Sequence, residues 1–293
     1  MQFFSLFIAI LVTAIWGFNF VVIKYCLSTI SPLMLCLLRF LLASVPFIFF
    51  IKPPKTSPQL VVLYGIIMFA LQFSLIFLGM ELGVEAGLAS LLLQTQVFFS
   101  LFMGVFLLGE RLRSWHVLGC TSAFLGIGIV IGHLETDVNF IGLFPILGGA
   151  LCSSTGNYIS KKIGIVNSFS LVIWGSLVAC PFTLLAAFAF EGTDAILLTL
   201  QTLDRNALLG VLFITFLSTI FGYSAWSWLI AHHPLRVITP FTLLVPVFAI
   251  VSSYFFLGEE LEPWKLIAAG CILFGLTLNL FGHHILRIRV PFD

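Results

Sequence analysis

The chain has 293 residues, of which 60% are hydrophobic and only 9% are charged, whereas a soluble domain carries roughly 25% charged residues. This composition excludes a water-soluble fold, and the net charge of +1 gives no reason to expect a nucleic-acid partner. The protein must therefore act within or against a lipid bilayer.

Apolar segments of about 20 residues, the length that crosses a bilayer as a helix, follow one another along the whole chain. No positively charged stretch precedes the first segment, so we expect no cleavable signal peptide. Divided at prolines, glycines and charges, the segments predict membrane spans at residues 3–24, 32–51, 59–80, 87–108, 116–133, 141–160, 168–190, 207–230, 237–257 and 265–286. The predicted fold class is an all-α integral membrane protein with ten transmembrane helices.

The short loops between these segments separate basic from acidic residues. With the N-terminus on the cytoplasmic side, the inner ends carry mainly basic residues, namely Lys52, Lys55, Arg111, Arg113, Lys161, Lys162, Arg236, Arg287 and Arg289. The outer ends collect acidic residues, namely Glu81, Glu85, Glu135, Asp137, Glu191, Asp194, Asp204, Glu259, Glu260 and Glu262. Because Lys and Arg are retained in the cytoplasm, we predict a multi-pass protein of the bacterial inner membrane with both termini cytoplasmic.

The sequence also contains an internal repeat. Residues 91–115 align without gaps on residues 240–264, an offset of 149 (264 minus 115), and the two segments share an LGE-L-W pattern. The predicted domains are therefore two five-helix repeats, residues 1–140 and 141–293. Since five is an odd number of spans, the second repeat must be inverted. Inverted repeats permit alternating access to a midplane site, which indicates a transporter, and a duplication that only builds a stable bundle is the alternative.

Several apolar motifs carry a family resemblance when they are taken together. They are WGFNFVVIK (16–24), PLMLCLLRF (32–40), AGLAS (86–90), LLGERL (107–112) and LLVPVF (243–248). With them, nearly the whole chain resembles the EamA branch of the drug/metabolite transporter superfamily. Two further segments, LGMELGVEAGLASLLLQTQ (78–96) and SLVIWGSL (170–177), resemble the subgroup of bacterial cysteine and O-acetylserine exporters.

This resemblance implies ten helices around a central cavity, lined mainly by helices 1, 3, 4, 6, 8 and 9. It also implies a secondary transporter that exports amino acids or related small polar metabolites, among which cysteine and O-acetylserine are candidates. The implied partners are the metabolite and membrane lipid. A membrane-embedded enzyme and a non-transporting scaffold are the alternatives, although no catalytic cluster or soluble module is visible in the sequence.

Polar side chains inside spans face a cavity or another helix, because they are costly in lipid. Trp16 and Asn19 share one face of the first span, and Asn19 suits a carboxylate or an ammonium group, with a bond between helices as the alternative. By the family resemblance, the cavity-lining helices also carry Gln72, Gln94, Gln96 and Asn157. Gln94 and Gln96 cannot both point at one site, so we expect at least one of them to be structural.

Two basic and two aromatic residues complete the predicted substrate-binding set. Lys24 closes the first span, where its stem can also reach the outer interface. Arg39 lies about 10 Å into the second span, and its guanidinium suits a substrate carboxylate, with ties to neighbouring carbonyls as the favoured alternative. Trp174 and Tyr223 are candidates for the cavity wall, with ordinary aromatic packing as the default.

The remaining signals concern motion, association and cofactors. Pro240 and Pro246 interrupt the ninth span and permit either a gating hinge or a static kink. Close helix contact, within the bundle or at a homodimer seam, is favoured by the small residues Gly119, Ala123, Gly126, Ala268, Gly275 and Gly282. The cysteines stand singly and HLETD (133–137) lies in a short loop, so we expect no metal and no cofactor.

Overall fold

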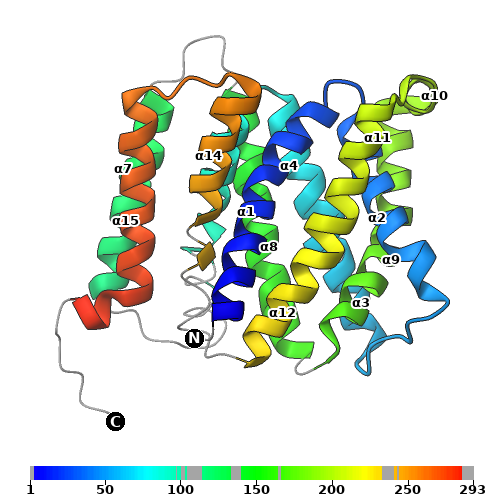
Figure 1. The fold of residues 1–293 in the computed structure, drawn as a ribbon, viewed down its shortest axis with the longest axis horizontal. Coiled ribbons are helices and arrows are strands. Elements are labelled where there is room, and N and C mark those ends of the chain that lie inside the picture. The colour runs from blue at the N-terminus through cyan, green and yellow to red at the C-terminus, as the bar shows by residue number, and fades with distance from the viewer. Residues whose placement is uncertain are drawn as a thin grey trace.

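The computed structural model describes residues 3–96, 98–99, 103, 114–132, 140–163, 166–232, 241–242 and 244–285. Throughout these residues the regular elements are helices, with no strand among them. The long helices stand side by side between the two ends of a bundle (Figure 1). The first helix, α1 (Phe3–Cys26), begins at the same end at which the last, α15 (Pro263–Ile285), finishes.

The first half of the chain continues from α1 through a series of helices. They are α2 (Pro32–Ile48), the joined segments α3 (Pro58–Tyr64), η1 (Gly65–Leu71) and α4 (Gln72–Glu81), then α5 (Ala86–Leu93) and α7 (Ser114–Gly132). Pro32 and Pro58 begin α2 and α3. Proline suits a first helical position, because its backbone angle is already helical and the missing N–H would have no partner there.

The second half of the chain is also a series of helices. Its elements are η2 (Phe140–Gly142), α8 (Leu143–Ile163), α9 (Ser168–Ala186), η3 (Ala187–Glu191), α10 (Gly192–Thr202), α11 (Arg205–Leu212), η4 (Phe213–Phe221), α12 (Gly222–His232), α14 (Leu244–Leu257) and finally α15. Side chains cap two of these helices: Asn167 accepts from the backbone N–H of Phe169 and Ser170, and Asp204 accepts from that of Ala207. Such caps satisfy N–H groups that a helix start leaves without partners.

The composition of the helices and of their outer surface is that of a membrane protein. Within the described residues, four helical stretches are long and apolar enough to cross a bilayer, namely Phe4–Cys26, Pro58–Glu81, Ser168–Asp194 and Arg205–Trp226. Large apolar side chains, including Phe50, Phe190 and Phe255, are exposed on the bundle. A surface of this kind matches a hydrocarbon solvent, in which helices satisfy their own backbone hydrogen bonds. The protein is therefore a multi-pass helical membrane protein.

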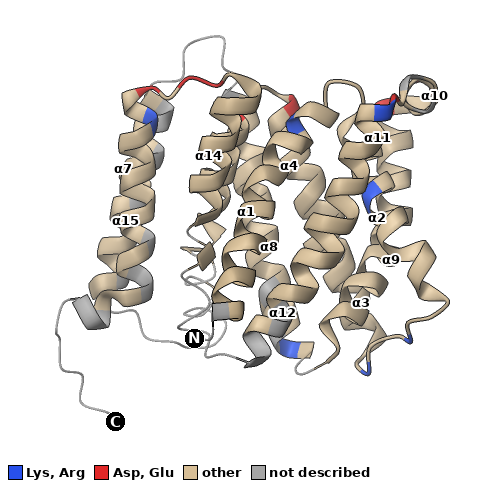
Figure 2. Cartoon of the chain, viewed as in Figure 1, with Lys and Arg blue, Asp and Glu red and all other residues tan. Residues whose placement is uncertain are grey.

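The two ends of the bundle differ in charge: the described carboxylates gather at the acidic end, together with Lys24, Arg205 and Lys265, and the opposite, basic end carries basic residues (Figure 2). The acidic end is where α4 finishes, α5 and α11 begin, and residues 258–262 connect α14 to α15. Its carboxylates are those of Glu81, Glu85, Glu191, Asp194, Asp204, Glu259, Glu260 and Glu262. The described part of the basic end carries Lys52, Lys55 and Lys162 instead. In the described residues, the carboxylates thus lie at one end of the helices.

Helices from the two halves of the chain pack in pairs. α7 lies along α15, α1 along α14, α2 along α9, and α4 along α8. At the first pair, Ser122 Oγ donates to Cys271 O at 2.8 Å, and a Cβ added to Gly126 would come within 2.8 Å of Ala268 O. Among the small residues of these two helices, Gly126 therefore serves a contact inside the bundle.

Three helical segments in the described residues are π-helical, namely η1, η3 and η4, and two of them, η1 and η4, occupy corresponding places in the sequence. Adding 149 to the bounds of η1, residues 65–71, gives residues 214–220, which η4 encloses. Thr219 Oγ1 donates to Ile214 O, five residues earlier, at 2.8 Å. π-helical turns are rare and occur frequently at functional sites, and both of these segments border the cluster of polar and aromatic residues described next.

Candidate functional site

A cluster of polar and aromatic side chains lies in the interior between α1, α2, the η1–α4 helix and the η4–α12 helix. We call it the central cluster, and it consists of Trp16, Asn19, Arg39, Phe69, Gln72, Phe73, Thr219 and Tyr223. Its helices come from both halves of the chain. These neighbouring helices carry five of the predicted substrate-binding residues, namely Trp16, Asn19, Arg39, Gln72 and Tyr223.

Trp16 joins α1 to the η4–α12 helix. Its indole Nε1 donates to Ser218 O at 3.1 Å, and its ring centroid lies 5.5 Å from that of Tyr223 and 5.3 Å from that of Trp226. A Cβ added to Gly222 would come within 2.5 Å of the indole nitrogen. A glycine at this position therefore allows the indole to reach the Ser218 carbonyl.

An aromatic ladder continues from Tyr223 towards Arg39. Tyr223 meets Phe69 edge to face at 6.3 Å, and Phe69 and Phe73 stack at 6.5 Å between centroids. The Arg39 guanidinium carbon lies 3.8 Å from the centre of the Phe73 ring. A cation over an aromatic face is stabilised by about 0.5–2 kcal/mol, which is far less than the cost of removing an isolated charge from water.

Arg39 is 1% exposed, and its Nε donates to Thr219 Oγ1 at 2.9 Å. The Arg39 side chain thus contacts a hydroxyl group and an aromatic ring, whereas the sequence analysis favoured contacts with neighbouring carbonyls. The Nη1 atom of Arg39 is buried without a hydrogen-bond partner among the described residues. Both ion pairs in that part of the chain belong to Lys265, so Arg39 has no carboxylate partner there.

Two amide oxygens share this lack of partners. Asn19 Oδ1 and Gln72 Oε1 have no hydrogen-bond partner among the described residues, and the two side chains are 6% and 4% exposed. A buried polar atom without a partner costs about 1–3 kcal/mol, and folded proteins leave few of them. Asn19 lies one turn from Trp16 on α1, and Gln72 precedes Phe73, whose ring contacts Arg39. The central cluster is therefore the candidate binding site.

The fourth span of the sequence is interrupted near its middle. α5 ends at Leu93, and the backbone N–H groups of Gln94 and Thr95 bond three residues back, to Leu91 O and Leu92 O. Gln94 is buried at this turn. Gln96 is tied to α8, since its side-chain oxygen accepts from Ser153 Oγ and its carbonyl accepts from Ser154 Oγ.

The other predicted site residues lie elsewhere. Lys24 Nζ donates to Met80 O at 2.7 Å, near the end of α4, and Trp174 Nε1 donates to Ile51 O at 3.1 Å, near the opposite end of the bundle. Asn157 lies on α8, but its side chain is outside what the structure describes. Pro246 is the third residue of α14, so it lies in the first turn; Pro240 falls outside the described residues.

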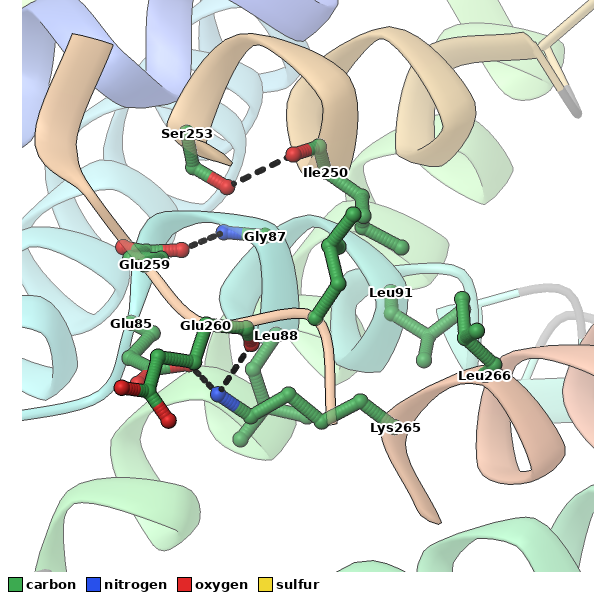
Figure 3. Close-up of a pocket in the computed structure, with 11 residues that line it drawn as sticks. Glu85, Gly87, Leu88, Leu91, Ile250, Ser253, Glu259, Glu260, Lys265 and Leu266 are labelled. Atoms are coloured by element: carbon green, nitrogen blue, oxygen red, sulfur yellow. Dashed lines mark hydrogen bonds and ion pairs between the residues drawn. The ribbon is translucent and has the colours of Figure 1, made fainter. Parts of the chain in front are cut away.

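A pocket opens at the acidic end between α5, α14 and the start of α15 (Figure 3). We call it the acidic mouth; its lining includes the polar residues Glu85, Ser253, Glu259, Glu260 and Lys265 and the apolar residues Leu88, Leu91, Ile250 and Leu266. Lys265 Nζ lies 2.6 Å from Glu85 Oε2 and also donates to Glu260 O at 3.0 Å. This lysine thus links α15 to the start of α5.

Glu259 is the acidic residue of the second LGE pattern in the sequence, and its carboxylate contacts the start of α5. Gly258 has a φ of +69°, a conformation that glycine adopts without strain, and it ends α14. The following carboxylate accepts from the backbone N–H of Ala86 at 2.7 Å and of Gly87 at 3.2 Å. A carboxylate at a helix N-terminus is stabilised by the free N–H groups and by the helix dipole, so Glu259 caps α5 from the connection between α14 and α15.

The sequence analysis did not identify several residues of the central cluster and of the acidic mouth. Phe73, Ser218 and Thr219 lie in apolar strings that contain no distinguishing pattern, and only the folded contacts bring them to Arg39 and Trp16. Glu259 was classed as one of the outer acids. The recurrence of the LGE pattern at an offset of 149 residues is the signal that points to Glu259, but only the structure identifies the start of α5 as its partner.

Comparison with known proteins identifies relatives along nearly the full length. The EamA-like transporter family matches residues 3–132 and 140–281. A Salmonella typhimurium protein named "Probable amino-acid metabolite efflux pump" is 37% identical over 290 residues, 96% of each chain. An Escherichia coli protein of the same name is 35% identical over 284 residues, 94% of each chain. One crystal structure, 17% identical, superposes with a TM-score of 0.62 over 99% of this chain and 100% of that one, which shows a shared fold.

Proposed function

Because this chain belongs to the EamA-like transporter family, we propose that it is a secondary transporter that exports amino acids or related small polar metabolites across the bacterial inner membrane. The observation that carries the proposal is the central cluster, which holds buried polar atoms without partners among the described residues. Such atoms are costly to a fold and useful to a passing polar solute. The names of the two relatives above support the class of substrate.

The transport mechanism that we propose is alternating access between two inverted five-helix repeats, residues 1–140 and 141–293. Three observations support the repeat. The η1 and η4 segments correspond at an offset of 149 residues, the α7 bounds 114–132 shifted by the same offset fall within α15, and Ser122 bonds its own repeat equivalent, Cys271. Paired contacts between equivalent helices are expected beside a two-fold axis. Rocking of one repeat against the other would expose the site to each side in turn.

The segregation of charge supports an orientation with the basic end in the cytoplasm. Reporter fusions would test it: fusions after Asp293 and near Arg111 should read cytoplasmic, and one near Glu260 periplasmic. In this orientation the acidic mouth forms the outer side of the export path, and its bonds between α5 and the α14–α15 connection hold that side closed. A periplasmic signal near Arg111 would contradict the inverted arrangement.

The energy source that we propose does not involve a carboxylate in the middle of the membrane. Proton-coupled transporters often use a buried acid for which proton and substrate compete, whereas the described carboxylates of this chain lie at the acidic end. Export down the metabolite gradient, or exchange, fits that placement. Vesicles with a substrate gradient and no pH gradient should show transport, and an absolute requirement for a pH gradient would contradict this part of the proposal.

The function itself is tested with purified protein in lipid vesicles. Radiolabelled amino acids and O-acetylserine are loaded, and efflux is followed with protein-free vesicles as the control. We expect protein-dependent efflux of at least one of these compounds, with saturation and competition among similar ones. The proposal fails if a broad panel of amino acids and their derivatives shows no flux above that of the protein-free vesicles.

A further inference from the structure

Arg39 is a buried cation whose environment leaves part of its guanidinium free. The residue lies seven positions after Pro32, about 10 Å along α2 from its start, and it is 1% exposed. A charge at this depth is expensive, and such residues pair with an opposite charge or serve a transport path. In the described chain, Arg39 has no carboxylate within ion-pair distance.

Two side chains contact this guanidinium, one at its Nε atom and one across its planar face. Nε donates to Thr219 Oγ1 at 2.9 Å, and the Phe73 ring lies 3.8 Å from the guanidinium carbon. Thr219 is itself fixed by its bond to Ile214 O within η4. These contacts orient the fork without neutralising its charge, because a hydroxyl and an aromatic ring are both uncharged.

The free edge has the chemistry that recognises a carboxylate. Nη1 has no partner among the described residues, although an arginine carries five N–H donors in a planar fork that matches carboxylate geometry. An arginine kept only for packing would be expected to have its buried donors satisfied. A buried charged group with an unpaired donor, held in one orientation, instead fits a ligand whose anion arrives and departs.

We propose that Arg39 is the carboxylate anchor of the transport path, so that the exporter selects metabolites with a free carboxylate over amines that lack one. This inference rests on the proposed export function. Thr219 and Phe73 act as positioning residues that hold the anchor. Asn19 Oδ1 and Gln72 Oε1, buried in the same cluster without described partners, are hydrogen-bond acceptors suited to the ammonium group of an amino acid.

The test compares acids with their decarboxylated counterparts on the full-length protein in vesicles. The probes are L-cysteine with cysteamine, kept reduced, and L-serine with ethanolamine. A hydrogen bond to a charged group corresponds to about 10- to 100-fold in affinity, so we expect the protein to prefer at least one acid over its amine by that factor. Equal flux of acid and amine, or a preference for the amine, would overturn the anchor while leaving export intact.

Variants then assign the preference to Arg39. In Arg39→Gln the acid should lose about tenfold or more in apparent affinity while the amine changes little, so that the acid-to-amine ratio approaches one. Ser176→Ala is the matched control, because Ser176 Oγ on α9 is also buried without a described partner and should leave the ratio unchanged. A ratio in Arg39→Gln equal to that of the unmodified protein would overturn the proposal.

If Arg39→Gln does not fold, a second variant decides the question. Phe73→Leu removes the ring against the guanidinium but keeps Arg39, so the acid-to-amine ratio should fall as the fork loses its orientation. An unchanged ratio in a folded Phe73→Leu protein would contradict the anchor. Absence of flux for every acid and amine in the unmodified protein would instead remove the export function and the anchor together.

Discussion

In the acidic mouth the carboxylates of Glu85 and Glu259 both have partners, whereas in the central cluster the amide oxygens of Asn19 and Gln72 have none among the described residues. Both places bring helices from the two halves of the chain together. Paired polar groups stabilise a fold, and unpaired buried ones cost stability. The comparison therefore predicts that substitutions in the cluster mainly lower transport, and that substitutions in the mouth mainly lower stability.

The largest expected effect is on transport in the central cluster. Asn19→Ala should lower export of the preferred substrate about 10- to 100-fold, because it removes an acceptor for a charged substrate group. The amount of folded protein in the membrane should remain near normal, since the lost oxygen has no described partner in the protein. Flux in vesicles and size-exclusion profiles in detergent measure the two quantities. Loss of folded protein would instead identify Asn19 as a tie between helices.

Gln72→Leu sharpens the same side of the comparison. Leucine has similar volume and removes an unpaired amide oxygen from a side chain that is 4% exposed. The free energy of unfolding should therefore stay the same or rise by up to about 2 kcal/mol, and the thermal midpoint should not fall. Export should fall at the same time. A more stable but slower transporter would show that Gln72 lowers the stability of the fold and contributes to substrate binding. Lower stability would instead show that Gln72 has a structural partner.

In the acidic mouth, removal of a paired carboxylate should lower the stability of the protein. Glu259→Ala leaves the first N–H groups of α5 without their carboxylate, a loss expected to cost about 1–2 kcal/mol of stability. Glu260→Ala is the matched control, because this neighbouring glutamate is exposed and does not cap α5. Thermal unfolding in detergent should separate the two variants. Equal midpoints for Glu259→Ala and Glu260→Ala would mean that the cap adds nothing to stability.

The sequence predicts some residues of the central cluster, and the structure is needed to identify the others. Trp16, Asn19, Arg39 and Gln72 stand out in the sequence because polar or large amphipathic groups are rare in apolar spans, and composition alone predicts the helical membrane class. The partners of Arg39 cannot be predicted in this way. Phe73 and Thr219 are distant in the chain and ordinary in type, and only the packing of α4 and η4 on α2 brings both of them to Arg39.

The smallest expected effect concerns the ion pair between Glu85 and Lys265, which provides a control for the whole comparison. Their side chains are 38% and 17% exposed, so water screens the pair, and exposed pairs contribute about 0.2–1 kcal/mol in double-mutant cycles. The cycle consists of Glu85→Gln, Lys265→Met and the double variant, with thermal unfolding in detergent as the measurement. The coupling should shrink towards zero at about 1 M salt, where the screening length is about 3 Å. A coupling above about 2 kcal/mol that resists salt would mean that the pair is shielded from water in the membrane. The acidic mouth would then be held shut mainly by this ion pair, and the Glu259 cap would be secondary.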